Sequence, residues 1–515
     1  MIVIRLFRLP FVLLAALVLS AAIGAPAAFA APKGAPPASP TPGPAPSPTA
    51  TPEPLDIAIP RLVAKLKVNP SDTATQTELA SDYYAANRPD LSIGLTQKLL
   101  AGGTKTAQIY YLDGVALLAL GRDKEAVADL ENAANLEPTN LQVLSTLTNI
   151  YIRAQRLPDA ERVAKRALTF NKDSKDAYVN YGQVLATEQK YDDARTQFEA
   201  AAKLDPKDAH PIVLEGRTYA DQNAVALATQ VFDRAVAIDP TSQEALYNKA
   251  RVAAAGHNVK DAVTTYEKLL TLQSTDEDRA AVVDEIARTY AVEKMASDAD
   301  TAYRRALTDY PKVSAAHVAY GDYLAFNKDI AGAEREWIAG VGPNRDNADA
   351  LGRLGELYAS KNDKSRALDN FKRMTEVAPN DARAFYSYGT QLAANNQYDK
   401  ARDAFKTSYG LSHTPESLIG LAQSDFATKN YKECATIYDS LDKAAPQLTK
   451  QNPQILFILG QCYQKSNDNA KARAAYVRFL SFVPANSQAS TQVKSLIAAL
   501  DKGNKPAPTA TPKKK

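Results

Sequence analysis

A small residue recurs at intervals of 34 positions through most of this 515-residue chain. The recurrence runs without a break from Ala126 to Ala262, slips by three residues before Ala299, and then resumes. Its members are Ala126, Ala160, Ala194, Ala228, Ala262, Ala299, Ala333, Ala367, Ala401, Cys434 and Ala472. A fixed period of this length indicates a chain that is built from copies of one supersecondary unit.

Three further residue types recur in phase with the small residue. A mostly aromatic position follows it by four residues, at Phe198, Phe232, Tyr266, Tyr303, Trp337, Phe371, Phe405, Tyr438 and Tyr476. Glycine often precedes it by twelve residues, at Gly114, Gly182, Gly216, Gly321, Gly355, Gly389 and Gly460. Proline often follows the aromatic position by eight residues, at Pro206, Pro240, Pro311, Pro379 and Pro484. Between glycine and proline the apolar residues fall at i, i+3, i+4 and i+7, which predicts two amphipathic helices joined by a short turn.

Each recurring residue has a physical reason. Glycine on the first helix and alanine on the second are expected to let the two backbones approach closely. The aromatic side chain is expected to fill the wedge between neighbouring hairpins, and proline ends the second helix. Because one helical hairpin cannot cover its own apolar face, the hairpins must stack on one another. The sequence therefore predicts an all-α solenoid.

The spacing resembles the tetratricopeptide-repeat (TPR) pattern, W-x2-L-G-x2-Y followed by A-x3-F and P. Typical units are EALYNKARVAAAGHNVKDAVTTYEKLL and ALGRLGELYASKNDKSRALDNFKRMTEVAP. The resemblance implies a right-handed α-α superhelix of about twelve helical-hairpin repeats. The units start near residues 73, 107, 141, 175, 209, 243, 280, 314, 348, 382, 415 and 453. For function the resemblance implies only a general scaffold that binds other proteins.

The solenoid is expected to occupy residues 56–500. Extra residues at 272–279 and 443–453 are expected to be loops at which blocks of repeats flex. Residues 57–68 are expected to form an opening helix, and Ser487 is expected to cap a last helix. The apolar residues of that capping helix lie on one face, at Val493, Leu496, Ile497 and Leu500.

The first thirty residues have the pattern of a secretory signal peptide. Arg5 and Arg8 precede an apolar run at 11–25, and the small residues around Phe29 predict cleavage after Ala30. An uncleaved membrane anchor is the alternative, but a spanning helix needs about 20 apolar residues. We therefore expect an exported protein whose signal peptide comprises residues 1–30.

The segments that flank the solenoid are rich in proline, alanine and threonine. Residues 31–55 are expected to form an extended linker, and residues 501–515 a disordered, Lys-rich tail. The net charge of +3 comes from 61 basic and 58 acidic residues, so no nucleic-acid partner is expected.

No arrangement of residues in the sequence predicts catalysis. The four histidines, which lie far apart and outside any metal-ligand spacing, are His210, His257, His317 and His413. The sequence also lacks a phosphate-binding glycine loop after a strand and a G-x-S-x-G motif. We therefore expect no enzyme, no catalytic residue, no metal and no cofactor.

The two cysteines fall in adjacent units. Cys434 lies on a second helix and Cys462 on the following first helix, and these helices are expected to pack together. An exported protein permits a disulfide between them. The alternative is a pair of small buried thiols, because Cys434 simply replaces the usual alanine.

One exposed position directly follows the glycine position, and the family resemblance places it on the concave surface. In seven successive units it is Asn149, Gln183, Arg217, Arg251, Arg288, Asp322 and Glu356. The order predicts a basic centre beside an acidic patch, where arginine would make bidentate contacts to carboxylates of an extended peptide. The alternative is an ordinary solvated row of charges.

These expectations combine into an exported protein-interaction scaffold, located in the periplasm or at the cell surface. It would bind a protein or peptide in the concave groove and assist assembly of an envelope or secretion complex. The alternative is a non-catalytic accessory subunit of a polysaccharide-export or peptidase system. Membrane contact is expected only through an uncleaved signal segment.

Overall fold

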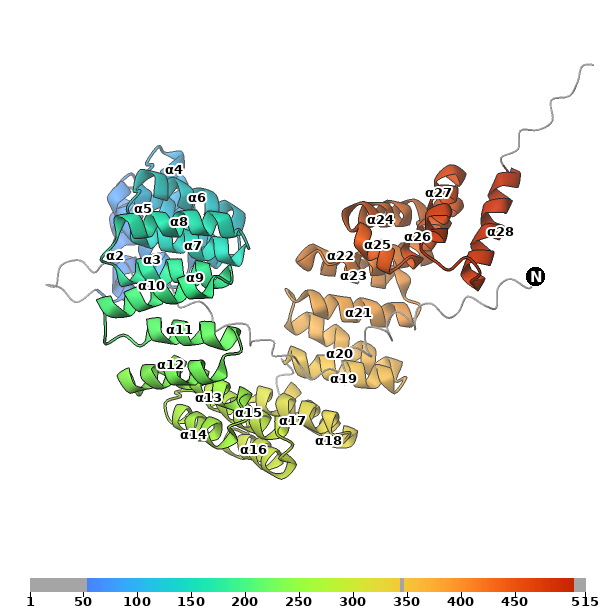
Figure 1. The fold of residues 1–515 in the computed structure, drawn as a ribbon. Helices are drawn as coiled ribbons and strands as arrows, with labels where there is room; N and C mark the ends of the chain where they lie inside the picture. Colours follow the sequence, from blue (N-terminus) through green and yellow to red (C-terminus); the bar gives the residue numbers. More distant parts are fainter. Residues whose placement is uncertain (1–52, 343–346, 504–515) are drawn as a thin grey trace, which may run out of the picture. The chain divides into compact units, whose positions relative to one another are not determined.

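The computed structural model describes residues 53–342 and 347–503. The predicted signal peptide at 1–30 lies outside the described residues, as do most of the predicted linker and most of the predicted tail. Every regular element in the described part is a helix, and the helices run from α2 to α28 (Figure 1). The predicted all-α fold class is confirmed.

The chain forms two compact units, which divide within α16 between residues 302 and 303. We call residues 53–302 the N-terminal unit, and residues 303–342 and 347–503 the C-terminal unit. Most helices pair in sequence order as the first and second helix of a hairpin, and twelve such pairs follow one another along the described chain. This number agrees with the repeats that the sequence predicts.

The N-terminal unit begins with one opening helix, α2 (Leu55–Val68). Its first helices are α3 (Thr73–Ala85), α5 (Ala107–Ala119), α7 (Leu141–Arg153), α9 (Lys175–Thr187), α11 (His210–Asp221), α13 (Gln243–Ala255) and α15 (Asp276–Val292). Its second helices are α4 (Pro89–Ala101), α6 (Asp123–Leu136), α8 (Leu157–Phe170), α10 (Tyr191–Leu204), α12 (Val225–Ile238), α14 (Val259–Leu270) and α16 (Ala296–Asp309), which continues into the C-terminal unit.

The C-terminal unit repeats the pattern and adds two helices. Its first helices are α17 (Ser314–Phe326), α19 (Ala348–Ser360), α21 (Ala382–Ala394), α23 (Pro415–Ala427) and α26 (Gln454–Lys465). Its second helices are α18 (Ile330–Val341), α20 (Lys364–Val377), α22 (Tyr398–Ser412), α24 (Tyr431–Ala444) and α27 (Asn469–Leu480). The additional helices are α25 (Pro446–Gln451) and α28 (Gln488–Gly503).

Two segments that the sequence analysis treats as loops are partly helical in the structure. Within 272–279, the last four residues form the first turn of α15, where Thr275 Oγ1 accepts a hydrogen bond from the Asp278 amide at 3.1 Å. Within 443–453, a proline at the first position starts the short helix α25. A capping threonine and a proline thus convert the extra residues into helix.

The last helix, α28, covers the end of the C-terminal unit. Val493 and Leu500 are buried against the core of the final hairpins, and Leu496 and Ile497 pack partly against it. Ser487 Oγ accepts a hydrogen bond from the Ser490 amide at 3.1 Å, which satisfies a free donor at the start of the helix.

In several hairpins the glycine position accommodates the aromatic ring of the same hairpin. A Cβ atom on Gly182 would lie 2.5 Å from Phe198 Cε1, and one on Gly355 would lie 2.7 Å from Phe371 Cε1. The sequence analysis expects close approach of two backbones at this point. Instead, the missing Cβ makes room for a ring that is nearly fully buried.

We predict that Gly182→Ala destabilises the protein by about 1–3 kcal/mol, because the added methyl group collides with the buried ring of Phe198. Gly94 is the matched control, since it lies inside α4 with open space around its Cα. Gly94→Ala should raise stability by about 0.5–1 kcal/mol through helix propensity alone. Thermal unfolding followed by circular dichroism measures both changes. Equal shifts of the unfolding temperature in the same direction would contradict the packing role of Gly182.

Two carboxyl groups meet inside the first hairpins of the N-terminal unit. Asp113 of α5 is 2% exposed and accepts a hydrogen bond from the Thr96 hydroxyl of α4. Burial, followed by the hydrogen bond and the charge of Asp113, raises the pKa of Asp129 on α6 to about 7. The carboxyl group of Asp129 therefore keeps its proton up to about pH 7.

The raised pKa predicts a pH-dependent stability. The folded state holds a proton on Asp129 that the unfolded chain releases near its ordinary pKa of about 4. The free energy of unfolding should therefore fall as pH rises from about 4 through 7. Urea titrations across this range should show this decline in the native protein and a weaker one in Asp129→Asn. Asp123→Asn, an exposed change on the same helix, should retain the native profile; a profile unaltered by Asp129→Asn would contradict the raised pKa of Asp129.

Candidate partner-binding surface

First helices of successive hairpins pack beside one another within the N-terminal unit. Contacts join α7 to α9, α9 to α11 and α11 to α13. Polar side chains also bridge first helices: Asn180 Nδ2 of α9 donates to Ser145 Oγ of α7 at 2.5 Å, and Tyr247 Oη of α13 donates to Glu285 Oε1 of α15 at 3.2 Å. Exposed residues at equivalent positions of these helices therefore form rows across one layer.

Three arginines at the predicted position lie on α11, α13 and α15. Arg217 and Arg288 are exposed, whereas Arg251 is half-buried with its guanidinium 5.7 Å from the centre of the Tyr247 ring. Arg288 Nη2 lies 2.8 Å from Asp284 Oδ2 one turn earlier on α15. We call these three side chains the arginine row.

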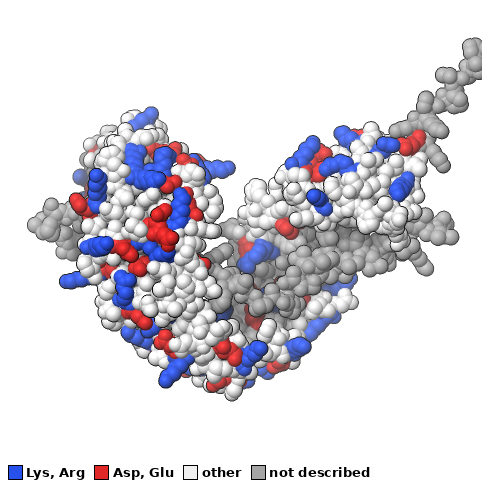
Figure 2. All heavy atoms as spheres, viewed as in Figure 1, with Lys and Arg blue, Asp and Glu red and all other residues white. Residues whose placement is uncertain are grey.

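Acidic groups lie among the arginines, which the sequence analysis does not predict. His210 Nδ1 lies 2.8 Å from Glu244 Oε2, and this hydrogen bond raises the pKa of His210 against an opposing contribution from Arg217. Asp284 and Glu285 flank the row on α15. Figure 2 likewise shows basic and acidic side chains interspersed over the visible face of the N-terminal unit.

Two other residues at this position lie earlier in the N-terminal unit. Asn149 on α7 is exposed, and Gln183 on α9 is half-buried. Both side chains are uncharged, so only the later part of the layer carries the arginine row.

The two predicted acidic residues belong to the C-terminal unit and already have protein partners. Asp322 of α17 accepts two hydrogen bonds from Arg353 of α19, at 3.0 and 3.1 Å, and a third from Trp337 Nε1 at 3.0 Å. Glu356 is exposed; loss of hydration raises the pKa of its carboxyl group, and the charge of Asp322 adds to this effect. Asp322 thus has a structural role, while Glu356 is exposed and its Oε2 lies 3.8 Å from Arg353 Nη1.

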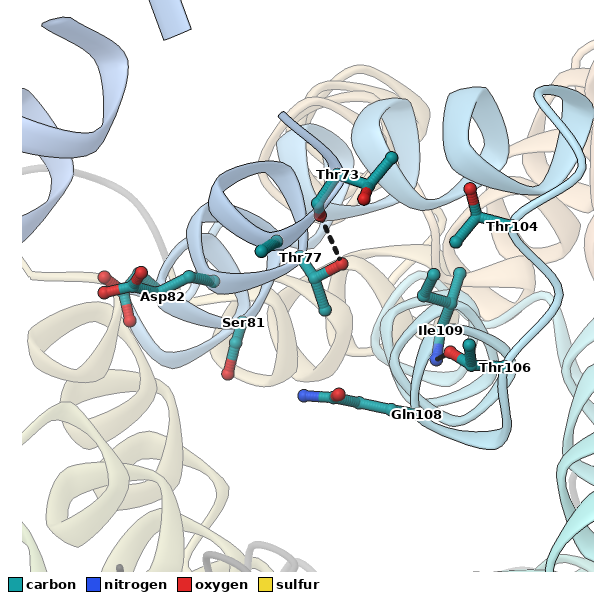
Figure 3. A pocket seen from close by; sticks show the side chains of 10 residues that line it. Thr73, Thr77, Ser81, Asp82, Thr104, Thr106, Gln108 and Ile109 are labelled. Atoms are coloured by element: carbon teal, nitrogen blue, oxygen red, sulfur yellow. Dashed lines mark hydrogen bonds between the residues drawn. The ribbon is translucent and has the colours of Figure 1, made fainter. Parts of the chain in front are cut away.

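Sequence reasoning misses a polar pocket between α3 and α5 at the start of the N-terminal unit (Figure 3). Its volume is about 480 Å³, and threonine, serine, glutamine and acidic side chains form most of its lining. A smaller pocket of about 170 Å³ lies among α6, α7 and α8. The spacing of residues gives no signal for either pocket, because both depend on side-chain conformation.

Cys434 of α24 and Cys462 of α26 form a disulfide in the structure, with a Cα–Cα distance of 6.0 Å. Both residues are fully buried. The bond joins the last two hairpins of the C-terminal unit, so it restricts their separation.

We predict that the native protein has no free thiol. A thiol titration under denaturing, non-reducing conditions should detect none, and two after reduction. Two reactive thiols before reduction would contradict the disulfide. Cys434→Ala with Cys462→Ala should lower the unfolding temperature of the oxidised protein, because the bond restricts the unfolded chain.

The described residues offer no group of three or more histidine, cysteine or acidic side chains that is arranged to hold a metal. Across 53–342 and 347–503, no helix is both long and apolar enough to span a membrane. The predicted absence of a cofactor and of catalysis stays a prediction.

Family profiles for the tetratricopeptide repeat match this chain along most of its hairpins. The matched residues are 77–138, 147–209, 213–277, 353–414 and 454–485, which together exceed half of the chain. The chain belongs to the TPR family. The predicted family resemblance is confirmed, and with it the solenoid of stacked repeats.

Curated relatives share the TPR region only in part. Human protein O-mannosyl-transferase TMTC3 is 25% identical over 223 residues, which cover 43% of this chain and 22% of that protein. The TPR repeat-containing thioredoxin TDX of Arabidopsis thaliana is 32% identical over 85 residues, which cover 16% of this chain and 22% of that protein. The chain thus spans about a fifth of the length of either relative.

Three solved structures are similar to parts of this chain. YrrB, described as a TPR protein with an unusual peptide-binding site, is 24% identical and covers 36% of this chain and 97% of its own, with a TM-score of 0.32. A TPR protein from Parabacteroides merdae is 17% identical and covers 46% of this chain and 92% of its own, with a TM-score of 0.39. Yeast Tom70 is 13% identical and covers 77% of this chain and 96% of its own, with a TM-score of 0.31.

Proposed function

We propose that this TPR protein is an exported scaffold that binds an extended, acidic segment of a partner protein on its first helices. The observation that carries the proposal is the arginine row, which places three guanidinium groups on three successive first helices. Membership of the TPR family supports the broader role in protein–protein interaction.

The arginine row suits carboxylates that are spaced along an extended chain. Guanidinium groups bind carboxylates through two parallel hydrogen bonds, and Arg251 is held against an aromatic ring. Packed helices lie about 8–10 Å apart, and a chain in the polyproline II conformation advances about 3.1 Å per residue with every third side chain on one face. A partner with an acidic residue at about every third position would therefore match the row.

The acidic residues within the row would contribute specificity. Asp284 and Glu285 would repel a partner whose carboxylates are out of register, while the arginines attract one that is in register. Electrostatic complementarity of this kind determines orientation and association rate more than affinity.

Export and a role in assembling an envelope or secretion complex remain part of the proposal. The N-terminal segment has the pattern of a signal peptide, and the buried disulfide suits an oxidising compartment outside the cytoplasm.

A labelled peptide with glutamate at every third residue tests the arginine row. Changing Arg217, Arg251 and Arg288 together to glutamate should weaken its binding by at least about a hundredfold in fluorescence anisotropy, because three attractions become repulsions. The matched control changes Arg162, Lys203 and Lys268 to glutamate, which gives the same net charge from exposed positions on second helices. This control should retain most of the affinity. An equal loss in both variants would show a non-specific charge effect and contradict the proposed site.

A further inference from the structure

Eight of the ten residues that line the pocket between α3 and α5 have polar side chains. Its lining residues are Thr73, Ala74, Thr77, Glu78, Ser81, Asp82, Thr104, Thr106, Gln108 and Ile109. No lysine, arginine or histidine is among them, and no aromatic ring. The pocket therefore offers hydroxyl, amide and carboxylate groups to a ligand, but no positive charge.

Several of these polar groups retain hydrogen-bonding capacity. Thr77 Oγ1 donates to the Thr73 carbonyl at 2.8 Å, so its oxygen can still accept. Figure 3 shows Ser81 and Gln108 reaching toward the same opening from α3 and α5. Within the described part of the chain, neither of these two side chains has a hydrogen-bond partner. A serine hydroxyl and a glutamine amide suit the backbone amides of a peptide.

Negative charge exceeds positive charge at the edge of the pocket. Arg61 of α2 forms ion pairs with Glu53 at 2.9 Å and with Glu78 at 3.3 Å. The nearby guanidinium group is therefore already paired with two carboxylates. The side chain of Asp82 forms no ion pair or hydrogen bond with any described residue. Partial burial raises the pKa of its carboxyl group, the charge of Glu78 raises it further, and the charge of Arg61 opposes both. Arg61 is thus the nearby cation, but its ion pairs are with Glu53 and Glu78 and not with Asp82.

We propose that this pocket binds a lysine or arginine side chain of an extended peptide, with Asp82 as the partner of the cation. The inference rests on the proposed function and adds a second, oppositely charged contact to it. Charge-assisted hydrogen bonds to a carboxylate are the strong interactions available to such a side chain. Ser81 and Gln108 would hold the adjoining peptide groups. A peptide is favoured over a carbohydrate because no ring is present on which a sugar could stack.

Methyl NMR of the full chain tests the pocket directly. The probe is Nα-acetyl-lysine N-methylamide, which carries two peptide groups and one ammonium group. It should shift the methyl signals of Ile109, Thr77 and Thr104, whereas the norleucine derivative, which lacks the ammonium group, should not. Asp82→Asn should weaken the lysine probe by about tenfold, because a charge-assisted hydrogen bond is lost.

Controls separate this site from the arginine row and from loss of folding. Asp82→Asn removes no intramolecular partner in the described residues, so its thermal unfolding should match the native protein. Reversal of the arginine row should abolish acidic-peptide binding and leave the lysine probe unaffected. The proposal would be overturned by equal shifts from the lysine and norleucine derivatives, or by lysine-derivative shifts that persist in Asp82→Asn. It would also be overturned if the lysine derivative produced no shift. Shifts produced by maltotriose but not by the lysine probe would also overturn it and assign the pocket to carbohydrate.

Discussion

The fit of one aromatic ring against one glycine sets the separation of the two helices in a typical hairpin. Phe198 and Phe371 lie nearly fully buried against the glycine positions of their own units. The ring occupies the space that any larger residue on the first helix would fill. This contact therefore holds the two helices of one hairpin together. Each hairpin still leaves apolar surface that only its neighbour can cover, so the hairpins must also stack.

This constraint also creates the candidate binding surface. When first helices of successive hairpins pack beside one another, a residue at one position of the unit recurs as a row across the layer. The position after the glycine holds different residues in successive units, because the ring and the alanine supply most of the packing. Asp322 uses this position for hydrogen bonds within the fold, whereas the arginine row uses it to present charge at the surface.

The sequence predicted the hairpins and their number, because both follow from contacts between residues close along the chain. It did not predict the turn residues. Gln155 and Gln189 adopt left-handed conformations with φ of 57° and 62°, which glycine would signal but glutamine does not. It also did not predict the ion pair between Arg353 and Asp322. That contact joins separate hairpins through side-chain conformations, which the spacing of residues does not determine.

The two proposed contacts lie in one unit and have opposite charge. The acidic pocket is formed by α3 and α5, and the arginine row by α11, α13 and α15, so the order of charge along the N-terminal unit is fixed by the order of its repeats. A partner with basic and acidic segments would satisfy both contacts in one direction and neither in the other. In the reverse direction like charges would face one another and weaken binding. Repulsion as well as attraction would therefore select the direction in which the partner binds. A solenoid of nearly identical hairpins could in this way distinguish the two ends of an extended chain.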